Sequence, residues 1–128
     1  MTHIDNAKEV FDIEIAGMNF VKSRLNESFE KAIIAILETK GRVVITGMGK
    51  SGLVGKKIAA TMSSTGTRTF FMHPGEAYHG DLGMISPSDV IIAISNSGET
   101  EEIIKLISFF KDNKNTVIAM TGKADSTL

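Results

Sequence analysis

Four short runs of consecutive apolar residues, separated by segments with helical periodicity, are the feature that most restricts the fold of this chain. The runs cover residues 42–46, 68–72, 89–94 and 115–120. They are dominated by adjacent apolar side chains rather than by alternation, which is typical of strands that are covered on both faces. The pattern therefore predicts a parallel sheet.

Segments with the spacing of amphipathic helices lie between these runs. One predicted helix presents Val54, Ile58 and Met62 on one face and ends at Gly66, and another presents Ile103, Ile107 and Phe110. The first forty residues are also predicted to be helical, from apolar residues at near-helical spacing: Ile4, Ala7, Phe11, Met18, Val21, Leu25, Phe29, Ile33, Ile36 and Leu37. Strands alternating with helices predict an α/β fold with a doubly wound parallel sheet in three layers.

The length, composition and net charge of the chain argue against a membrane protein, a secreted protein and a nucleic-acid-binding protein. The 128 residues suit one domain, with 42% hydrophobic and 23% charged residues, and no apolar run is long enough to cross a membrane. The start of the chain lacks signal-peptide character and there is no cysteine, so a cytoplasmic location is expected. A net charge of −1 with scattered basic residues argues against a nucleic-acid partner.

The first strand is followed by a glycine-rich turn, GMGKSG, at residues 47–52. Gly49 permits close approach to the backbone, while Lys50 and Ser51 add a cation and a hydroxyl at a helix start. A dinucleotide site is disfavoured because the next strand ends in Met72, His73 and Pro74 instead of an acidic residue. A P-loop is disfavoured because its first glycine position is occupied by Val44.

The third strand is followed by a second polar turn, SNSGET, at residues 95–100. Ser95, Asn96, Ser97 and Thr100 surround a glycine at the start of the next helix. Since the turns that follow parallel strands meet at one edge of the sheet, the two turns together predict a site for a small anion such as a phosphate. The alternative is that both are ordinary glycine turns with capping hydroxyls.

Three further residues are candidates for proton-transfer chemistry. Glu102 lies one turn after the hydroxyl cluster and suits a general base, although a carboxylate there also favours the helix dipole. Lys50 suits charge stabilisation, or it is a solvated surface group. His79 lies in a connection of about fifteen residues, longer than the usual 2 to 6, and suits acid–base work or local hydrogen bonding. Metal binding by this connection is disfavoured because its His73, Glu76, His79 and Asp81 match no zinc signature.

Three quoted segments together closely resemble the sugar isomerase (SIS) domain of the arabinose-5-phosphate isomerase family: GMGKSG, STGT followed by FFMHPGEAYHGDLGMI, and DVIIAISNSGET. The resemblance spans about residues 41–122. It implies a flavodoxin-like sheet of five parallel strands, no organic cofactor and a homotetramer. It also implies catalytic roles for Lys50, His79 and Glu102, and phosphate binding by the hydroxyls of Ser51, Ser95, Ser97 and Thr100. Gly49 and Asn96, in the same two turns, are further candidates for binding the substrate.

The implied reaction is the interconversion of D-ribulose 5-phosphate and D-arabinose 5-phosphate through an enediol, which supplies the eight-carbon sugar acid of lipopolysaccharide or capsule. The chain is expected to be the N-terminal part of the domain, with a helical lead-in at 1–40 and a phosphosugar-binding core at 41–128. The family's fifth strand, later histidine segment and CBS modules are expected to be missing. A non-catalytic phosphosugar sensor and an inactive fragment remain the alternatives.

Overall fold

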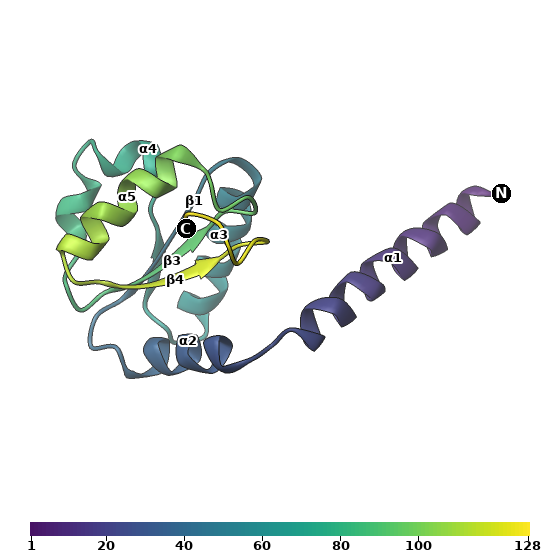
Figure 1. Cartoon of the computed structure of the whole chain (residues 1–128), viewed down its shortest axis with the longest axis horizontal. Helices are drawn as coiled ribbons and strands as arrows, with labels where there is room; N and C mark the ends of the chain where they lie inside the picture. Colours follow the sequence, from purple (N-terminus) through teal and green to yellow (C-terminus); the bar gives the residue numbers. More distant parts are fainter. The chain divides into compact units, whose positions relative to one another are not determined.

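The computed structural model describes all residues from 1 to 128. It contains two compact units, Met1–Ile33 and Ile34–Leu128. The second unit holds the sheet and is the part of Figure 1 that carries the labels β1, β3 and β4. The predicted boundary at residue 40 stays a prediction.

The first unit is built around α1, His3–Ser23. A capping box starts this helix: Thr2 Oγ1 accepts the Asp5 N–H at 3.1 Å, and Asp5 Oδ2 accepts the Thr2 N–H at 2.8 Å. The hydrogen bonds donated by the Thr2 backbone and hydroxyl lower the pKa of Asp5. No residue of α1 is buried. The following helix, α2 (Glu27–Glu38), begins in the first unit and ends in the second.

The second unit contains a four-stranded parallel sheet in the order β2-β1-β3-β4. The strands are β1 (Val43–Gly47), β2 (Thr69–Phe71), β3 (Val90–Ile94) and β4 (Thr116–Met120). The predicted parallel α/β fold is thereby confirmed. The central strands β1 and β3 are almost wholly buried, whereas β4 at the edge is half-exposed, as expected of a strand without a neighbour on one side.

One face of the sheet is covered by α3, Gly49–Ser64. The predicted contact face of this helix was partly wrong, because Val54 is 55% exposed and the buried residues are Gly52, Gly55 and Ala59. A side chain at Gly55 would come within 3.0 Å of Ile45. Small residues therefore let the helix backbone approach the sheet closely, while larger side chains lie beside the contact.

The other face is covered by α5 (Glu101–Asp112) and by the long connection between β2 and β3. The connection forms two short helices, α4 (Pro74–Ala77) and the 3₁₀ helix η1 (Asp81–Met84). Figure 1 shows α4 and α5 on the same side of the sheet. Their apolar residues share one core cluster with the sheet: Val44, Met72, Ala77, Ile85, Ile91, Leu106 and Phe110. The predicted inward face of α5 is confirmed by the complete burial of Ile103 and Phe110.

A buried carboxylate joins the start of β1 to the start of β3. Asp89 is 1% exposed, and its two oxygens accept the backbone N–H of Arg42 at 2.7 Å and of Ser86 at 2.8 Å. The Arg42 guanidinium adds an ion pair at 3.7 Å. Asn115 donates its side-chain amide to the Asp89 carbonyl at 2.9 Å. The carboxylate therefore satisfies backbone donors from two different segments.

Candidate functional site

The two polar turns predicted from the sequence lie side by side at one edge of the sheet. Strands β1 and β3 are neighbours, and Gly47 at the end of β1 is in register with Ile94 at the end of β3. The chain leaves β1 for β2 on one side, whereas β3 lies on the other side. This is the point where strand order reverses, and open α/β sheets bind ligands there.

The first turn leads directly into α3 without a side-chain cap. Met48 occupies the N-cap position and makes no capping hydrogen bond, and no acidic residue lies in the first turn of the helix. The backbone N–H groups of Gly49, Lys50 and Ser51 donate no hydrogen bond within the chain. Gly49 has a φ of 56°, a conformation that favours glycine. The start of α3 therefore presents free donors and the positive end of the helix dipole to an anion.

A cavity of about 440 Å³ adjoins this turn. It is lined by Gly47, Gly49, Lys50, Gly52, Leu53, Lys56, Phe71 and His73. The Lys56 Nζ atom lies 5.5 Å from the centroid of the Phe71 ring. His73 accepts the Gly75 N–H on Nδ1 at 3.0 Å, which leaves Nε2 without a partner. Two lysines and a histidine thus face one hollow beside the first turn.

Lys56 was not among the residues predicted from the sequence. It follows Lys50 by six positions in α3, and this spacing does not place two side chains on one face of a helix. Only the packing of α3 against β2 brings Lys56 over Phe71 and into the same cavity as Lys50.

The second turn is held in shape by its own hydroxyls. Ser95 is buried, its Oγ atom lies 2.7 Å from Thr100 Oγ1, and the same Oγ accepts the Gly98 N–H at 3.1 Å. Thr100 is the N-cap of α5, yet its side chain makes no capping bond because it is paired with Ser95. Ser97 Oγ accepts the Glu99 N–H at 3.1 Å. The loop is thus preorganised by bonds across the turn.

The second turn also has free backbone donors. The N–H groups of Ser97, Thr100 and Glu101 donate no hydrogen bond within the chain. They lie at the start of α5, where the helix dipole favours negative charge. Together with the free donors of α3, they give the switch point two groups of donors that suit an anion. No residue of the second turn lines the cavity beside the first turn.

The remaining predicted residues are exposed. Glu102 lies in the first turn of α5, next to the second polar turn. Asn96 is exposed, and its carbonyl accepts the N–H of Gly122 in the segment after β4. His79 lies between α4 and η1, where its N–H donates to the Glu76 carbonyl at 3.0 Å. His79 does not line the cavity that contains Lys50, so its catalytic role stays a prediction.

Two other kinds of feature are absent from the chain. No three His, Asp or Glu side chains are grouped so that they could hold a metal ion. None of the helices combines the length and the apolar character that a membrane span requires.

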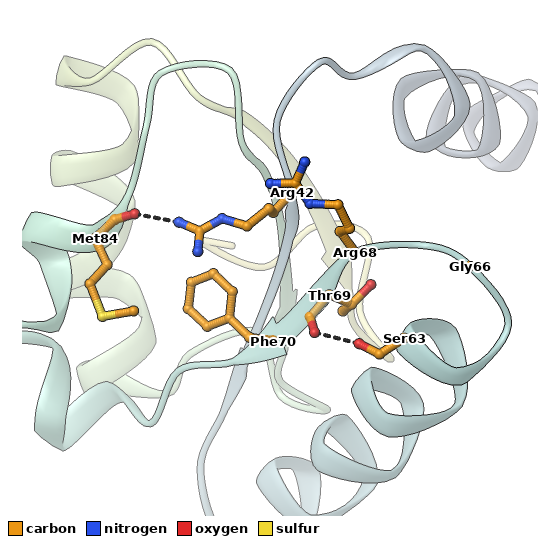
Figure 2. A pocket seen from close by; sticks show the side chains of 7 residues that line it. All are labelled: Arg42, Ser63, Gly66, Arg68, Thr69, Phe70 and Met84. Atoms are coloured by element: carbon orange, nitrogen blue, oxygen red, sulfur yellow. Dashed lines mark hydrogen bonds between the residues drawn. The ribbon is translucent and has the colours of Figure 1, made fainter.

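A second hollow of about 540 Å³ lies at the opposite edge of the sheet, near the amino ends of β1 and β2. Figure 2 shows Arg42 reaching across it to the Met84 carbonyl, at 2.7 Å, with its guanidinium 4.6 Å from the Phe70 ring centroid. Arg42 therefore links β1 to η1 and to β2. This hollow is separate from the two polar turns.

Fold and site together define a parallel α/β protein with an anion site at the sheet's switch point. Residues 36–128 match the SIS domain family. The match includes the whole sheet and both polar turns, so the chain belongs to the SIS domain family.

Named relatives are more specific than the family. The chain is 53% identical to an arabinose 5-phosphate isomerase (KdsD) of Francisella tularensis, over 99% of this chain and 40% of the relative. It is 50% identical to the enzyme of the same name from Pseudomonas aeruginosa, over 98% of this chain and 38% of the relative. The chain thus spans about 40% of the length of these curated relatives.

A solved structure with a bound sugar phosphate is also similar. It is an Escherichia coli CFT073 protein in complex with arabinose 5-phosphate, with a TM-score of 0.88 and 39% identity. The alignment covers 98% of this chain and 69% of that structure. The chain therefore shares the fold of that protein.

Proposed function

We propose that this chain is part of an aldose–ketose isomerase that interconverts D-ribulose 5-phosphate and D-arabinose 5-phosphate. The observation that carries the proposal is the pair of adjacent turns after β1 and β3, each with free backbone donors and hydroxyls at a helix start. The names of the relatives and the solved complex with arabinose 5-phosphate support this choice of substrate.

The phosphate is bound by both turns. Ser51 and the Gly49 backbone contribute from the start of α3. The second turn contributes Ser95, Asn96, Ser97 and Thr100. Because these donors come from backbone and hydroxyl groups, the site needs no net positive charge in the protein, in agreement with the formal charge of −1.

The proton is moved by Glu102. In the aldose, the carboxylate removes the proton from C2 while the carbonyl oxygen at C1 gains one, which produces the enediol. The same carboxyl returns its proton to C1 as the C2 hydroxyl loses its proton, and the ketose results. Lys50 stabilises the negative charge that develops on the oxygens, and His79 assists proton exchange. The two proton transfers conserve atoms and electrons between aldose and ketose, so the reaction requires no cofactor.

The product of this reaction is an aldopentose phosphate. We place the reaction in the cytoplasm. We also propose that its product supplies the synthesis of the eight-carbon sugar acid of lipopolysaccharide or capsule. The name shared by the relatives supports arabinose 5-phosphate as the product. Because the chain spans about 40% of the length of those relatives, the activity belongs to the protein of which this chain is a part.

We further propose that the protein is a homo-oligomer, a tetramer, in which α1 packs against a second copy. Ile4, Phe11, Met18 and Leu25 recur every seven residues along this unit, and each is more than half exposed. A seven-residue apolar repeat is what a helix uses to pack along another helix. An apolar stripe of this length is rarely left in water, so a partner helix is expected to cover it.

Introducing charge on this stripe is expected to break the oligomer. The double substitution Phe11→Asp and Met18→Asp should convert the protein to monomers, measured as molar mass by light scattering during gel filtration. The control is Asn19→Asp, which should leave the molar mass unchanged. Asn19 follows Asp5 and Asp12 at the same seven-residue spacing, so the added carboxylate lies on a polar stripe of the helix. An unchanged mass for the double variant would remove α1 from the interface.

The reaction itself is tested by proton NMR in D₂O. Ribulose 5-phosphate is incubated with this chain and, in parallel, with the full-length gene product. Appearance of arabinose 5-phosphate carrying deuterium at C2 is expected for the active form, because the abstracted proton exchanges with solvent in the enediol route. Binding of the sugar phosphate without any conversion by either protein would instead support a sensor.

A further inference from the structure

The segment that follows β4 lies directly against the second polar turn. The Met120 carbonyl accepts the Ser95 N–H at 3.0 Å, and the Asn96 carbonyl accepts the Gly122 N–H at 2.9 Å. The Gly98 carbonyl then accepts the Leu128 N–H at 3.0 Å. Backbone bonds thus tie the turn to the end of β4 and to the segment 121–128 at three successive places.

Two glycines allow this close contact. Gly98 has a φ of 69°, and a side chain at this position would overlap Ser126. A side chain at Gly122 would come within 2.6 Å of the Asn96 Oδ1 atom. The turn and the segment 121–128 therefore pack closely against each other at these two glycines.

The Glu99 side chain forms two hydrogen bonds between the second polar turn and the segment 121–128. Its two carboxylate oxygens accept the Thr127 N–H at 2.7 Å and the Thr127 hydroxyl at 2.6 Å. These side-chain and backbone hydrogen bonds from Thr127 lower the pKa of Glu99. Glu99 sits between Gly98, whose conformation shapes the turn, and Thr100, whose hydroxyl is paired with Ser95.

We infer that Glu99 and Thr127 are positioning residues that hold residues 95–100 in the conformation that binds phosphate. This inference rests on the proposed function. Glu99 points its carboxylate at Thr127 and not into the site, which is why an acidic residue is tolerated within an anion-binding loop. Holding the loop in place before the ligand arrives lowers the entropy cost of binding and so raises affinity.

The pair also predicts a pH dependence. The folded-state pKa of Glu99 is lowered. The stabilisation that its ionised carboxylate gives to the loop is therefore fully present above the unfolded-state pKa, and it is lost as pH falls through the lower folded-state pKa. Protonation removes the charge that strengthens both hydrogen bonds from Thr127 and the attraction to Lys123. Affinity for phosphate should therefore decline at the acid end in the unaltered protein, and this component should be absent when Glu99 is replaced by glutamine.

The test is the dissociation constant for arabinose 5-phosphate and for inorganic phosphate, measured by calorimetry. Glu99→Gln replaces the charged carboxylate by a neutral amide, and we expect binding to weaken about fivefold or more, because the charge-assisted hydrogen bonds from Thr127 are lost. Thr127→Val, which removes only the hydroxyl, should act in the same direction. Thr127→Ser keeps both donors and should retain the affinity of the unaltered protein.

Glu38→Gln is the matched control. It makes the same chemical change at an exposed residue in the last turn of α2, outside both polar turns. This variant should bind phosphate with the affinity of the unaltered protein. Equal affinity for the unaltered protein, Glu99→Gln and Thr127→Val would overturn the inference. Binding of inorganic phosphate but not of arabinose 5-phosphate would overturn the proposed substrate alone, whereas binding of neither would overturn both.

Discussion

Replacing Glu102 by glutamine is expected to lower kcat by about 10²- to 10⁴-fold, the usual contribution of a general base. The amide is nearly the same size as the carboxylate but cannot take a proton from C2 of the sugar. Glu102 is exposed at the start of α5, so the change should leave folding intact. The measurement is the rate of deuterium incorporation at C2 of arabinose 5-phosphate, in the form of the protein that the D₂O experiment shows to be active.

Glu38→Gln again supplies the control. It removes the same charge from an exposed residue that lies outside both polar turns. Exposed substitutions of this kind have little effect, so turnover should be nearly normal. If Glu102→Gln kept turnover close to that of Glu38→Gln, the general base would have to be another residue.

Replacing Asp89 by alanine is expected to lower the free energy of unfolding by about 2–4 kcal/mol, since each backbone donor left without an acceptor costs about 1–3 kcal/mol. The carboxylate is buried and accepts N–H groups from the segments before β1 and before β3. Its loss also leaves Arg42 without the ion pair at 3.7 Å. The midpoint of urea unfolding, followed by circular dichroism, measures the effect.

Asp112→Ala is the comparison for this stability experiment. Asp112 is exposed at the end of α5 and makes no ion pair, so its replacement should change the free energy of unfolding by less than about 0.5 kcal/mol. Asp89→Asn should fall between the two, because one amide oxygen can still accept a backbone N–H. Equal stability of Asp89→Ala and Asp112→Ala would show that Asp89 does not hold the two strands together.

Much of the fold could be predicted because it depends on local patterns of apolar residues. The runs around Val44 and Ile91 indicated buried parallel strands, and both strands are confirmed at the centre of the sheet. The contact face of α3 was predicted incorrectly because hydrophobic periodicity takes no account of glycine. Gly52 and Gly55 form the closest contact with the sheet although they have no apolar side chain.

The candidate site could be predicted only in part. The two turns were identified from their glycines and hydroxyls, and the order of the strands places them side by side. Lys56 was missed, since its place beside the first turn depends on how α3 packs against Phe71. His79 was a candidate from its place in the long connection as well as from the resemblance, and it lies outside the cavity that Lys50 lines.

The sequence by itself determined which segments form strands and helices and which turns carry anion-binding groups, because those properties depend on residues close together in the chain. Only the tertiary structure decided which distant residues meet. Glu99 and Thr127 are separated by 28 positions, and Arg42 and Asp89 by 47. Such contacts are set by the parallel pairing of β1, β3 and β4, which brings the starts of β1 and β3 together at one edge of the sheet and the segments after β3 and β4 together at the other.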